Sequence, residues 1–182
     1  MKDDTAHIFE TIYSKESDAI FRFCLLRVSN REQALDITQE TFLRLWQSLV
    51  DKKEIRNNRA FLFTIAHHLI IDWYRKKKSI SLESIMDKDR EIVYDPMDEK
   101  TRSSLEWGPE GRYLLGKISE LSPTFYDAVY LSFVEGMSPG EIGEILGISA
   151  NATSVRINRG LVELRKKTGY YKKGNEKDNE RQ

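Results

Sequence analysis

The four prolines of this 182-residue chain all lie after position 95. Because proline disrupts the interior of a helix, its absence leaves long helices possible in the first half. Large apolar residues recur there at three- and four-residue spacing, which predicts one helix over 5–28, a second that ends at Val50 and a third over 59–78. The clearest runs are Phe42, Leu45, Trp46 and Leu49 in the second helix and Leu62, Ile65, Leu69 and Trp73 in the third. The first half is therefore predicted to form a small three-helix bundle.

Capping residues mark where these helices begin. The run Ser29-Asn30-Arg31-Glu32 fits a capping box, in which Ser29 caps the second helix and Glu32 reaches back to it. A polar loop over 51–58 follows, and Asn57 or Asn58 is expected to cap the third helix.

The second half carries helix punctuation that includes proline. Ser122-Pro123 places an N-cap before a proline at the first helical position, and Ser138-Pro139 does the same with Glu141 two residues further on. Gly147 separates a short helix from a long one that Ser149 caps. The predicted helices span 113–121, 124–134, 140–146 and 150–167. With no convincing strand pattern, the predicted fold class is all-α, with two small helical bundles.

Charge is distributed unevenly along a chain that is neutral as a whole, with 29 Lys+Arg and 29 Asp+Glu. Residues 51–78 carry eight cations and three anions, and residues 150–173 carry seven cations and one anion. Residues 79–110 carry nine anions and four cations and lack a sustained helical period. Two basic segments joined by an acidic flexible linker predict two contacts with a polyanion.

The stretch 138–167 has the pattern of a helix-turn-helix: a short helix, a glycine turn and a capped helix rich in arginine. In that geometry the N-terminal residues of the second helix reach base edges, and cations hold phosphates. The candidate DNA-binding residues are Ser149, Asn151, Ser154, Arg156 and Arg159. The alternative is an ordinary helical hairpin with a solvated basic face.

The third helix carries aromatic rings beside a run of cations. Thr64, His68, Asp72 and Arg75 share one side of it, and Trp73 precedes Arg75, Lys76 and Lys77. Rings that stack on unpaired bases and cations that hold the backbone suit single-stranded nucleic acid. The alternative is that Trp73 belongs to the core and the cations form a solvated helix end. Metal binding is not expected, because the pair His67-His68 lacks zinc-ligand spacing.

The second helix carries a mixed polar and apolar stripe, which consists of Asp36, Gln39, Glu40, Leu43 and Gln47. Such a stripe is either a solvated face or a surface for a protein partner. Physical arguments alone leave both interpretations open.

These segments together resemble a known family. Residues 36–42 (DITQETF) and 61–75 (FLFTIAHHLIIDWYR) resemble region 2 of bacterial RNA polymerase sigma factors, and residues 121–166 resemble their region 4. The chain is most similar to the extracytoplasmic-function (ECF) group. The implied organisation is region 2 over 1–78, an acidic linker over 79–110, region 4 over 111–169 and a disordered tail over 170–182.

The resemblance implies a role for each group of residues. Core RNA polymerase is expected to contact Asp36, Gln39, Glu40, Phe42 and Leu43. Region 2 is expected to open the minus-10 promoter element and capture a flipped base. The minus-10 residues implied in this way are Arg56, Asn57, Asn58, Thr64, His68, Asp72, Trp73, Arg75, Lys76 and Lys77. Region 4 is expected to read the minus-35 element as duplex through the helix-turn-helix residues, to which the resemblance adds Asn158. His68 stands where the family commonly has asparagine, so its ring presents donor and acceptor at a different reach.

The expected partners are core RNA polymerase and promoter DNA, both duplex and single-stranded, and the family often adds an anti-sigma factor. We expect no cofactor, no catalysis, no contact with membranes and a cytoplasmic location. One cysteine, Cys24, excludes an intramolecular disulfide. The alternative function is a stand-alone helix-turn-helix regulator that binds duplex DNA without polymerase.

Overall fold

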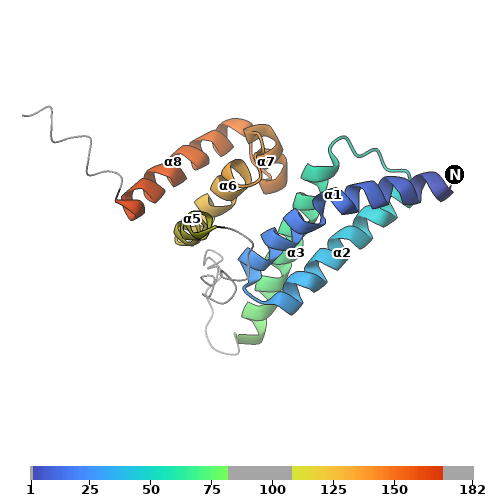
Figure 1. Cartoon of the computed structure of the whole chain (residues 1–182), viewed down its shortest axis with the longest axis horizontal. Coiled ribbons are helices and arrows are strands. Elements are labelled where there is room, and N and C mark those ends of the chain that lie inside the picture. The colour runs from blue at the N-terminus through green and yellow to red at the C-terminus, as the bar shows by residue number, and fades with distance from the viewer. Residues whose placement is uncertain (1, 82–107, 170–182) are drawn as a thin grey trace, which may run out of the picture.

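The computed structural model describes residues 2–81 and 108–169 of the chain. These residues form helices and no strand, which confirms the predicted all-α fold class (Figure 1). The helices are α1 (Lys2–Val28), α2 (Arg31–Val50), α3 (Asn58–Ser81), α5 (Pro109–Ser119), α6 (Pro123–Phe133), α7 (Pro139–Leu146) and α8 (Ala150–Thr168). The predicted tail and most of the predicted linker lie outside the described residues.

Helices α1, α2 and α3 pack against one another and are called the front module below. The Tyr74 hydroxyl of α3 donates a hydrogen bond to the backbone carbonyl of Arg27 in α1. The core of the module is filled by apolar side chains with almost no exposed surface: Ile20, Phe23, Leu45, Leu62, Phe63 and Ile70. The spacing of apolar residues predicted that one stripe of α3 is buried. Because Phe63 and Ile70 are buried as well as Leu62, a wider side of this helix is covered.

The start of α2 differs from the sequence prediction. Asn30 is the N-cap: its backbone is extended, and its side-chain oxygen accepts a hydrogen bond from the Gln33 N–H at 3.0 Å. Ser29 adopts a left-handed conformation (φ 50°), and its N–H donates to the Leu25 carbonyl at the end of α1. Because only two residues join the helices, the first ends α1 and the second is left to cap α2. The prediction of Ser29 as the cap was therefore wrong.

Three of the other predicted caps are confirmed, whereas Ser122 occupies the N-cap position of α6 without a side-chain hydrogen bond to that helix. Asn57 caps α3, since its side-chain oxygen accepts from the Ala60 N–H at 3.0 Å. Ser138 and Glu141 form a reciprocal capping box at the start of α7. Ser149 caps α8. Each cap satisfies backbone donors that the first turn of a helix leaves unpaired.

Helices α5 to α8 form a second group, called the rear module below (Figure 1). Two glycines shape the turn between α7 and α8. Gly147 is left-handed (φ 66°), a conformation that costs other residues energy. Gly143 allows a close approach, because an added Cβ would lie 2.6 Å from the Ile148 carbonyl oxygen. The turn therefore fixes how α8 projects from the module.

The two modules lie against each other, and one continuous apolar core runs through both. Helix α3 of the front module contacts α7 of the rear module (Figure 1). Phe23 of α1 faces Tyr130 of α6, with 5.7 Å between ring centroids. The sequence analysis predicted two bundles but not this contact.

Candidate nucleic-acid and protein interfaces

The outer side of α8 is the first candidate surface for DNA. The inner side of this helix is buried against the rear module at three successive turns. Asn151, Asn158 and Arg159 are exposed on the outer side, and Arg156 is half-buried at its edge. A helix that follows a tight turn and exposes amide and guanidinium groups near its N-terminus can reach base edges and phosphates in a major groove.

The two serines of the predicted set take part in the local structure of α8. The Ser149 oxygen accepts from the Ala152 N–H at 3.1 Å, as the helix cap. The Ser154 hydroxyl donates to the Ala150 carbonyl at 3.0 Å. A hydroxyl oxygen keeps further acceptor capacity when it makes one such bond. Ser149 is exposed and Ser154 half-buried, so the two differ in how readily they meet a ligand.

Val155 was missed in the sequence analysis. It is 42% exposed and lies one turn from both Asn151 and Asn158, in the middle of the outer side of α8. An apolar side chain at such a place suits the methyl group of thymine. Its spacing from the polar residues was the signal that could have identified it.

The predicted polar stripe of α3 faces solvent. His68, Asp72 and Arg75 are exposed, and the half-buried Thr64 donates its hydroxyl to the Ala60 carbonyl at 2.8 Å. The Asp72 carboxylate lies 3.7 Å from the Arg75 guanidinium. Because these side chains are already on the surface, a strand of DNA can reach them without rearrangement of the helix.

Trp73 combines the two interpretations that the sequence left open. It is half-buried and packs against the front core, with its ring 4.8 Å from that of Tyr74. The Lys77 ammonium lies over the Trp73 ring, 5.2 Å from its centroid, and Lys76 and Lys77 are exposed. The ring is therefore a partly buried anchor, next to cations that can hold a phosphate backbone.

The loop before α3 is exposed in the middle and anchored at its end. Arg56 is exposed, 3.8 Å from the Glu54 carboxylate. Asn57 caps α3 and also donates from its amide nitrogen to Glu141 of α7 at 2.8 Å. Asn58 is half-buried as the first residue of α3. The structure thus brings the predicted loop residues next to α3 but engages one of them with the rear module.

An apolar groove between α1 and α2 is the candidate surface for a protein. Its volume is about 540 Å³, and it lies toward the N-terminal end of α1, away from the rear module (Figure 1). Its aromatic residues contact one another edge to face, for example Phe9 and Trp46 at 5.3 Å between centroids. The lining residues are Ala6, Phe9, Glu10, Tyr13, Gln39, Phe42, Leu43 and Trp46.

Three of the five predicted polymerase-contacting residues line this groove. Leu43 is 50% exposed and Gln39 is exposed, whereas Phe42 is only 3% exposed. Asp36 is exposed outside the groove, and Glu40 is held by the Arg44 guanidinium at 2.7 Å. The aromatic residues contributed by α1 were missed, because their spacing did not distinguish a buried ring from one at the rim of a groove.

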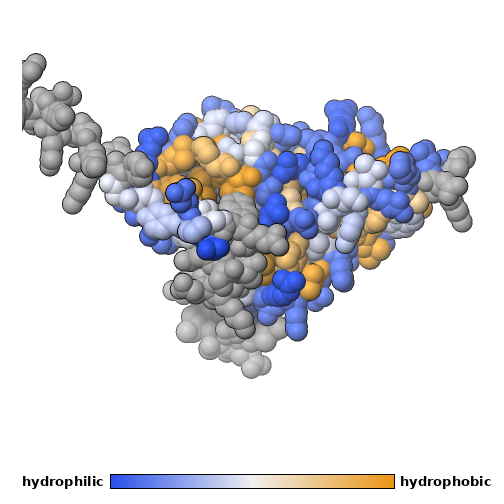
Figure 2. Space-filling view, in the orientation of Figure 1, coloured by the Kyte–Doolittle hydropathy of each residue, from blue (hydrophilic) through white to orange (hydrophobic). Residues whose placement is uncertain are grey.

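The rear module also has apolar surface. Figure 2 shows an apolar patch over the rear module. The exposed large apolar residues of this module include Leu114 of α5 and Val162 of α8. Contiguous exposed apolar surface marks interaction sites more often than scattered residues do. The rear module is therefore a candidate for protein contacts as well as for DNA.

Among residues 2–81 and 108–169, no group of three or more His, Cys, Asp and Glu side chains is arranged to hold a metal ion. In the same ranges, no helix has the length and apolar character needed to span a bilayer. Burial raises the pKa of the Cys24 thiol to about 12, so this cysteine is a core residue that stays protonated.

Comparison with known proteins identifies both modules. The family model for sigma-70 region 2 matches residues 12–80, and the model for sigma-70 region 4 matches residues 112–164. The ECF RNA polymerase sigma factor SigE of Mycolicibacterium smegmatis is 30% identical over 158 residues, which are 86% of this chain and 60% of that protein. The ECF RNA polymerase sigma factor SigW of Bacillus subtilis is 29% identical over 166 residues, which are 87% of each chain.

Solved structures agree on the fold. The sigma factor RpoE of Bartonella quintana, in complex with the anti-sigma factor NepR, matches with a TM-score of 0.69 and 20% identity over 88% of this chain and 96% of that one. CnrH, in complex with the cytosolic domain of CnrY, matches with a TM-score of 0.63 and 20% identity over 91% of this chain and 90% of that one. The two matched regions, their order and the helices that carry them show that this chain belongs to the sigma-70 family of bacterial RNA polymerase sigma factors, in its ECF group.

Proposed function

We propose that this protein binds core RNA polymerase and directs it to promoters, where it contacts two DNA elements in different states. The observation that carries the proposal is that three chemically different surfaces are exposed on separate parts of the molecule. α8 offers a polar, basic side suited to duplex DNA, and α3 offers an aromatic and basic surface suited to an unpaired strand. The groove of the front module is left for the polymerase.

The minus-35 element is proposed to bind to the rear module as duplex. Ser149, Asn151, Ser154, Arg156, Asn158 and Arg159 supply the polar and charged contacts, and Val155 adds an apolar one. The support is that these residues lie on α8, whose inner side is buried and whose N-terminal turn is capped. In this proposal residues 111–169 are the minus-35-binding domain and residues 79–110 connect it to the minus-10-binding domain, although α3 extends to Ser81 and α5 begins at Pro109.

The minus-10 element is proposed to bind as a separated strand to a domain over residues 1–78, which contains most of the front module. His68, Asp72 and Arg75 face solvent on α3, and Arg56 is exposed in the loop before it. Unpairing a base costs a few kcal/mol, and contacts to the flipped base offset part of that cost. In this role the cations after Trp73 hold the backbone while neighbouring side chains stabilise the unpaired bases.

Core polymerase is proposed to insert an apolar side of its own into the groove between α1 and α2. Leu43 and Tyr13 are exposed at this groove, at 50% and 47%, although both are apolar enough to be buried. Helices that dock in such a groove gain affinity from a few anchors. Asp36 and Glu40, next to the groove on α2, supply polar contacts at its rim.

As a member of a family of regulators, the chain is proposed to act without catalysis of its own, in the cytoplasm where its polymerase and DNA partners lie. We also include an anti-sigma factor among its partners. The support is that RpoE of Bartonella quintana forms a complex with such a factor.

Run-off transcription tests the proposal. Purified core polymerase with this protein should initiate at defined start sites on promoters drawn from a genomic library, and core polymerase alone should not. Absence of selective initiation, with no inhibitor present, contradicts the proposal. Tight and specific duplex binding without polymerase would instead favour the stand-alone regulator.

A further inference from the structure

We propose that Asp72, together with His68, selects an unpaired guanine in the separated minus-10 strand. The two residues are exposed and lie one turn apart on the same side of α3, where they present a carboxylate and an imidazole to the strand. The inference rests on the proposed function, in which this side of α3 holds the strand, and it adds the base that this side prefers.

The charge around Asp72 is the first observation. Asp72 is the only acidic residue of α3, whereas five residues of that helix are arginine or lysine, and four of those follow Asp72 within six positions. A surface that holds a phosphate backbone gains affinity from cations, so an anion among them weakens binding. A carboxylate in this place therefore needs a contact with some other part of the DNA to offset the repulsion.

The pair that Asp72 forms within α3 does not account for it. The Arg75 guanidinium lies 3.7 Å from the Asp72 carboxylate, which is beyond hydrogen-bond distance. The two side chains are 73% and 59% exposed, and an exposed ion pair of this kind contributes little to stability. The carboxylate therefore keeps its capacity to accept hydrogen bonds from a ligand.

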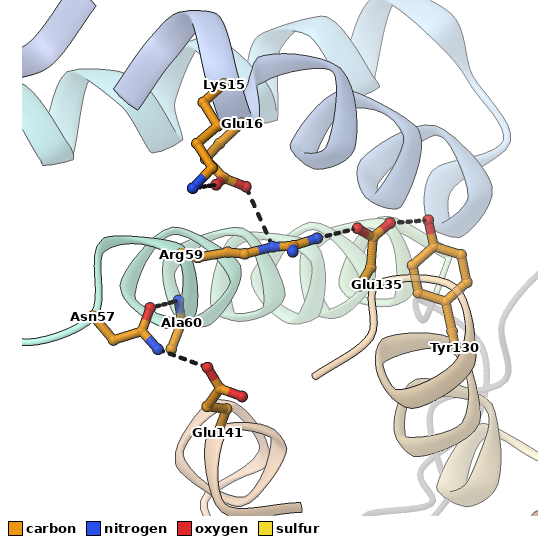
Figure 3. Close-up of polar contacts among 8 residues, drawn as sticks. All are labelled: Lys15, Glu16, Asn57, Arg59, Ala60, Tyr130, Glu135 and Glu141. Atoms are coloured by element: carbon orange, nitrogen blue, oxygen red, sulfur yellow. Dashed lines mark hydrogen bonds and ion pairs between the residues drawn. The ribbon is translucent and has the colours of Figure 1, made fainter. Parts of the chain in front are cut away.

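Polar side chains at the other end of this region are engaged by protein partners (Figure 3). The Asn57 amide nitrogen donates to Glu141 Oε1 at 2.8 Å. The Arg59 guanidinium donates to Glu135 Oε2 at 2.6 Å. These contacts engage both side chains, so we assign recognition of the base to the later turns of α3.

His68 and Asp72 meet that requirement. Both side chains are exposed, and neither makes a hydrogen bond to any other part of the chain that the structure describes. Side chains four residues apart on a helix have Cβ atoms about 5–6 Å apart, so both can reach the edge of a single base.

Guanine is the base whose Watson–Crick edge fits a carboxylate. It places N1–H and the N2 amino group side by side, and the two oxygens of one carboxylate can accept from both. Adenine and cytosine place one amino group beside a ring nitrogen that is itself an acceptor, and thymine flanks its single N–H with two carbonyl oxygens. In these bases an acceptor faces the carboxylate and is repelled. Asp72 therefore favours guanine over the other three bases.

His68 completes the recognition at O6 of the same base. An imidazole carries at least one N–H in either protonation state, and guanine O6 accepts a hydrogen bond beside N1–H. Together the two side chains donate one hydrogen bond and accept two. Cytosine presents the same pattern to guanine in a base pair, so the pair of side chains replaces the partner that guanine loses when the strands separate.

Binding of single-stranded oligonucleotides to core polymerase assembled with this protein tests the inference. The probe is the non-template minus-10 strand of a promoter found by run-off transcription, with each position occupied in turn by the four bases. At one position guanine should bind about 5–150-fold more tightly than the other bases, which is the range of one good bidentate base contact.

Base analogues at that position identify the atoms. Inosine lacks the N2 amino group and should bind about fivefold or more weakly than guanine, whereas 7-deazaguanine keeps the whole Watson–Crick edge and should bind as guanine does. In Asp72→Ala, inosine and guanine should bind alike. In His68→Ala, the guanine strand should bind more weakly, but the difference between guanine and inosine should remain, because Asp72 still contacts the N2 amino group.

The matched control is Glu54→Ala, which removes an exposed carboxylate 3.8 Å from Arg56 in the loop before α3. It removes the same charge from the same region as Asp72→Ala, so both variants should bind all strands somewhat more tightly through weaker repulsion of phosphates. Only Asp72→Ala should change the preference among bases. Circular dichroism should show equal helicity in every variant, because all three side chains are exposed.

The outcomes separate this inference from the proposed function. Strand binding with no position that prefers guanine overturns the inference, and so does a guanine preference that Asp72→Ala leaves intact. Both of these results leave the proposed function standing. Absence of strand binding by the assembled complex overturns the proposed function, and this inference with it.

Discussion

At the scale of single residues, the outer side of α8 offers two chemically different contacts. Arg159 is exposed and charged, and Val155 nearby is exposed and apolar. We expect Arg159→Ala to weaken binding to all minus-35 duplexes by a similar factor and to reduce the salt slope by about one, as loss of a phosphate contact does. Val155→Ala should change the preference at one base pair, by about 1–3 kcal/mol, and leave the salt slope intact.

Anisotropy titrations against single-base variants of a minus-35 duplex, at several salt concentrations, measure both effects. An equal loss of affinity for all duplexes with Val155→Ala would contradict its contact with a single base pair. A loss of affinity confined to variants of one base pair with Arg159→Ala would contradict its phosphate contact.

His67 couples the stability of the protein to pH. Burial, with the charges of Arg27 and His68, lowers its pKa from 6.5 to about 4. Between these values the unfolded chain binds a proton that the folded chain does not, so the free energy of unfolding falls as the pH falls from about 6.5 to 4. The contribution at pH 7 relative to pH 4 is on the order of 3 kcal/mol at about 1.4 kcal/mol per pKa unit.

Urea unfolding at pH 7 and pH 4.5 measures this dependence. His67→Gln should lose less stability on acidification than the unsubstituted protein, and the exposed His68→Gln should behave much like the unsubstituted protein. Equal losses in all three proteins would mean that His67 does not carry the dependence.

At the scale of elements, two glycines of α7 predict opposite responses to the same substitution. A Cβ at Gly143 would lie 2.6 Å from a backbone oxygen, which cannot move without opening the turn, whereas the nearest atom to one at Gly140 is 3.9 Å away. We expect Gly143→Ala to destabilise the rear module by more than about 1 kcal/mol through overpacking. Gly140→Ala should be neutral or stabilise it by about 0.5–1 kcal/mol, because alanine favours a helix. Thermal unfolding checks both, and equal melting temperatures would contradict the tight turn.

The groove of the front module gives a second prediction for an element. Leu43 lines it and is 50% exposed, whereas Leu35 is 40% exposed on the same helix outside the groove. Leu43→Ala should lower the affinity for core polymerase by about 1–2 kcal/mol without a change in folding, as loss of an apolar anchor does. Leu35→Ala is the matched control and should retain binding in a co-purification assay. Equal retention of both variants would remove the groove from the polymerase interface.

Most elements could be predicted from local signals, because those signals act over a few residues. Spacing of apolar side chains and the caps at Asn57, Ser138 and Ser149 located helix ends within a few positions of where they lie. The prediction for Ser29 failed because Ser29 and Asn30 can each cap α2. The left-handed conformation of Ser29, which leaves Asn30 as the cap, is not encoded in a sequence motif. Candidate residues on α8 and along α3 were proposed from the same kind of local signal, whereas those in the loop before α3 were proposed from the family resemblance. The groove was not predicted, because it needs α1 and α2 to be placed side by side.

At the scale of the whole molecule, the contact between modules could not be predicted from the sequence. Arg59 and Glu135 are 76 positions apart, and Asn57 and Glu141 are 84 apart. No periodicity links such pairs, and a buried arginine looks the same in sequence as a solvated one. His67 illustrates the point: the sequence analysis considered it only as a metal ligand beside His68, and in the structure it is buried 3.6 Å from Asp127 of α6.

Two modules on one chain also predict how promoter spacing affects binding. Each module raises the effective concentration of the other at its own element, which can strengthen binding by about 10²–10⁴-fold over a single element. Insertion of five base pairs between the elements turns them to opposite sides of the duplex, since one turn takes about 10–10.5 base pairs. We therefore expect the affinity of the polymerase complex to fall toward that for the minus-10 element alone, whereas a one-base-pair insertion should cost far less. Titrations against a series of spacer lengths measure this, and affinity that does not vary with spacing would mean that the two modules never bind one promoter together.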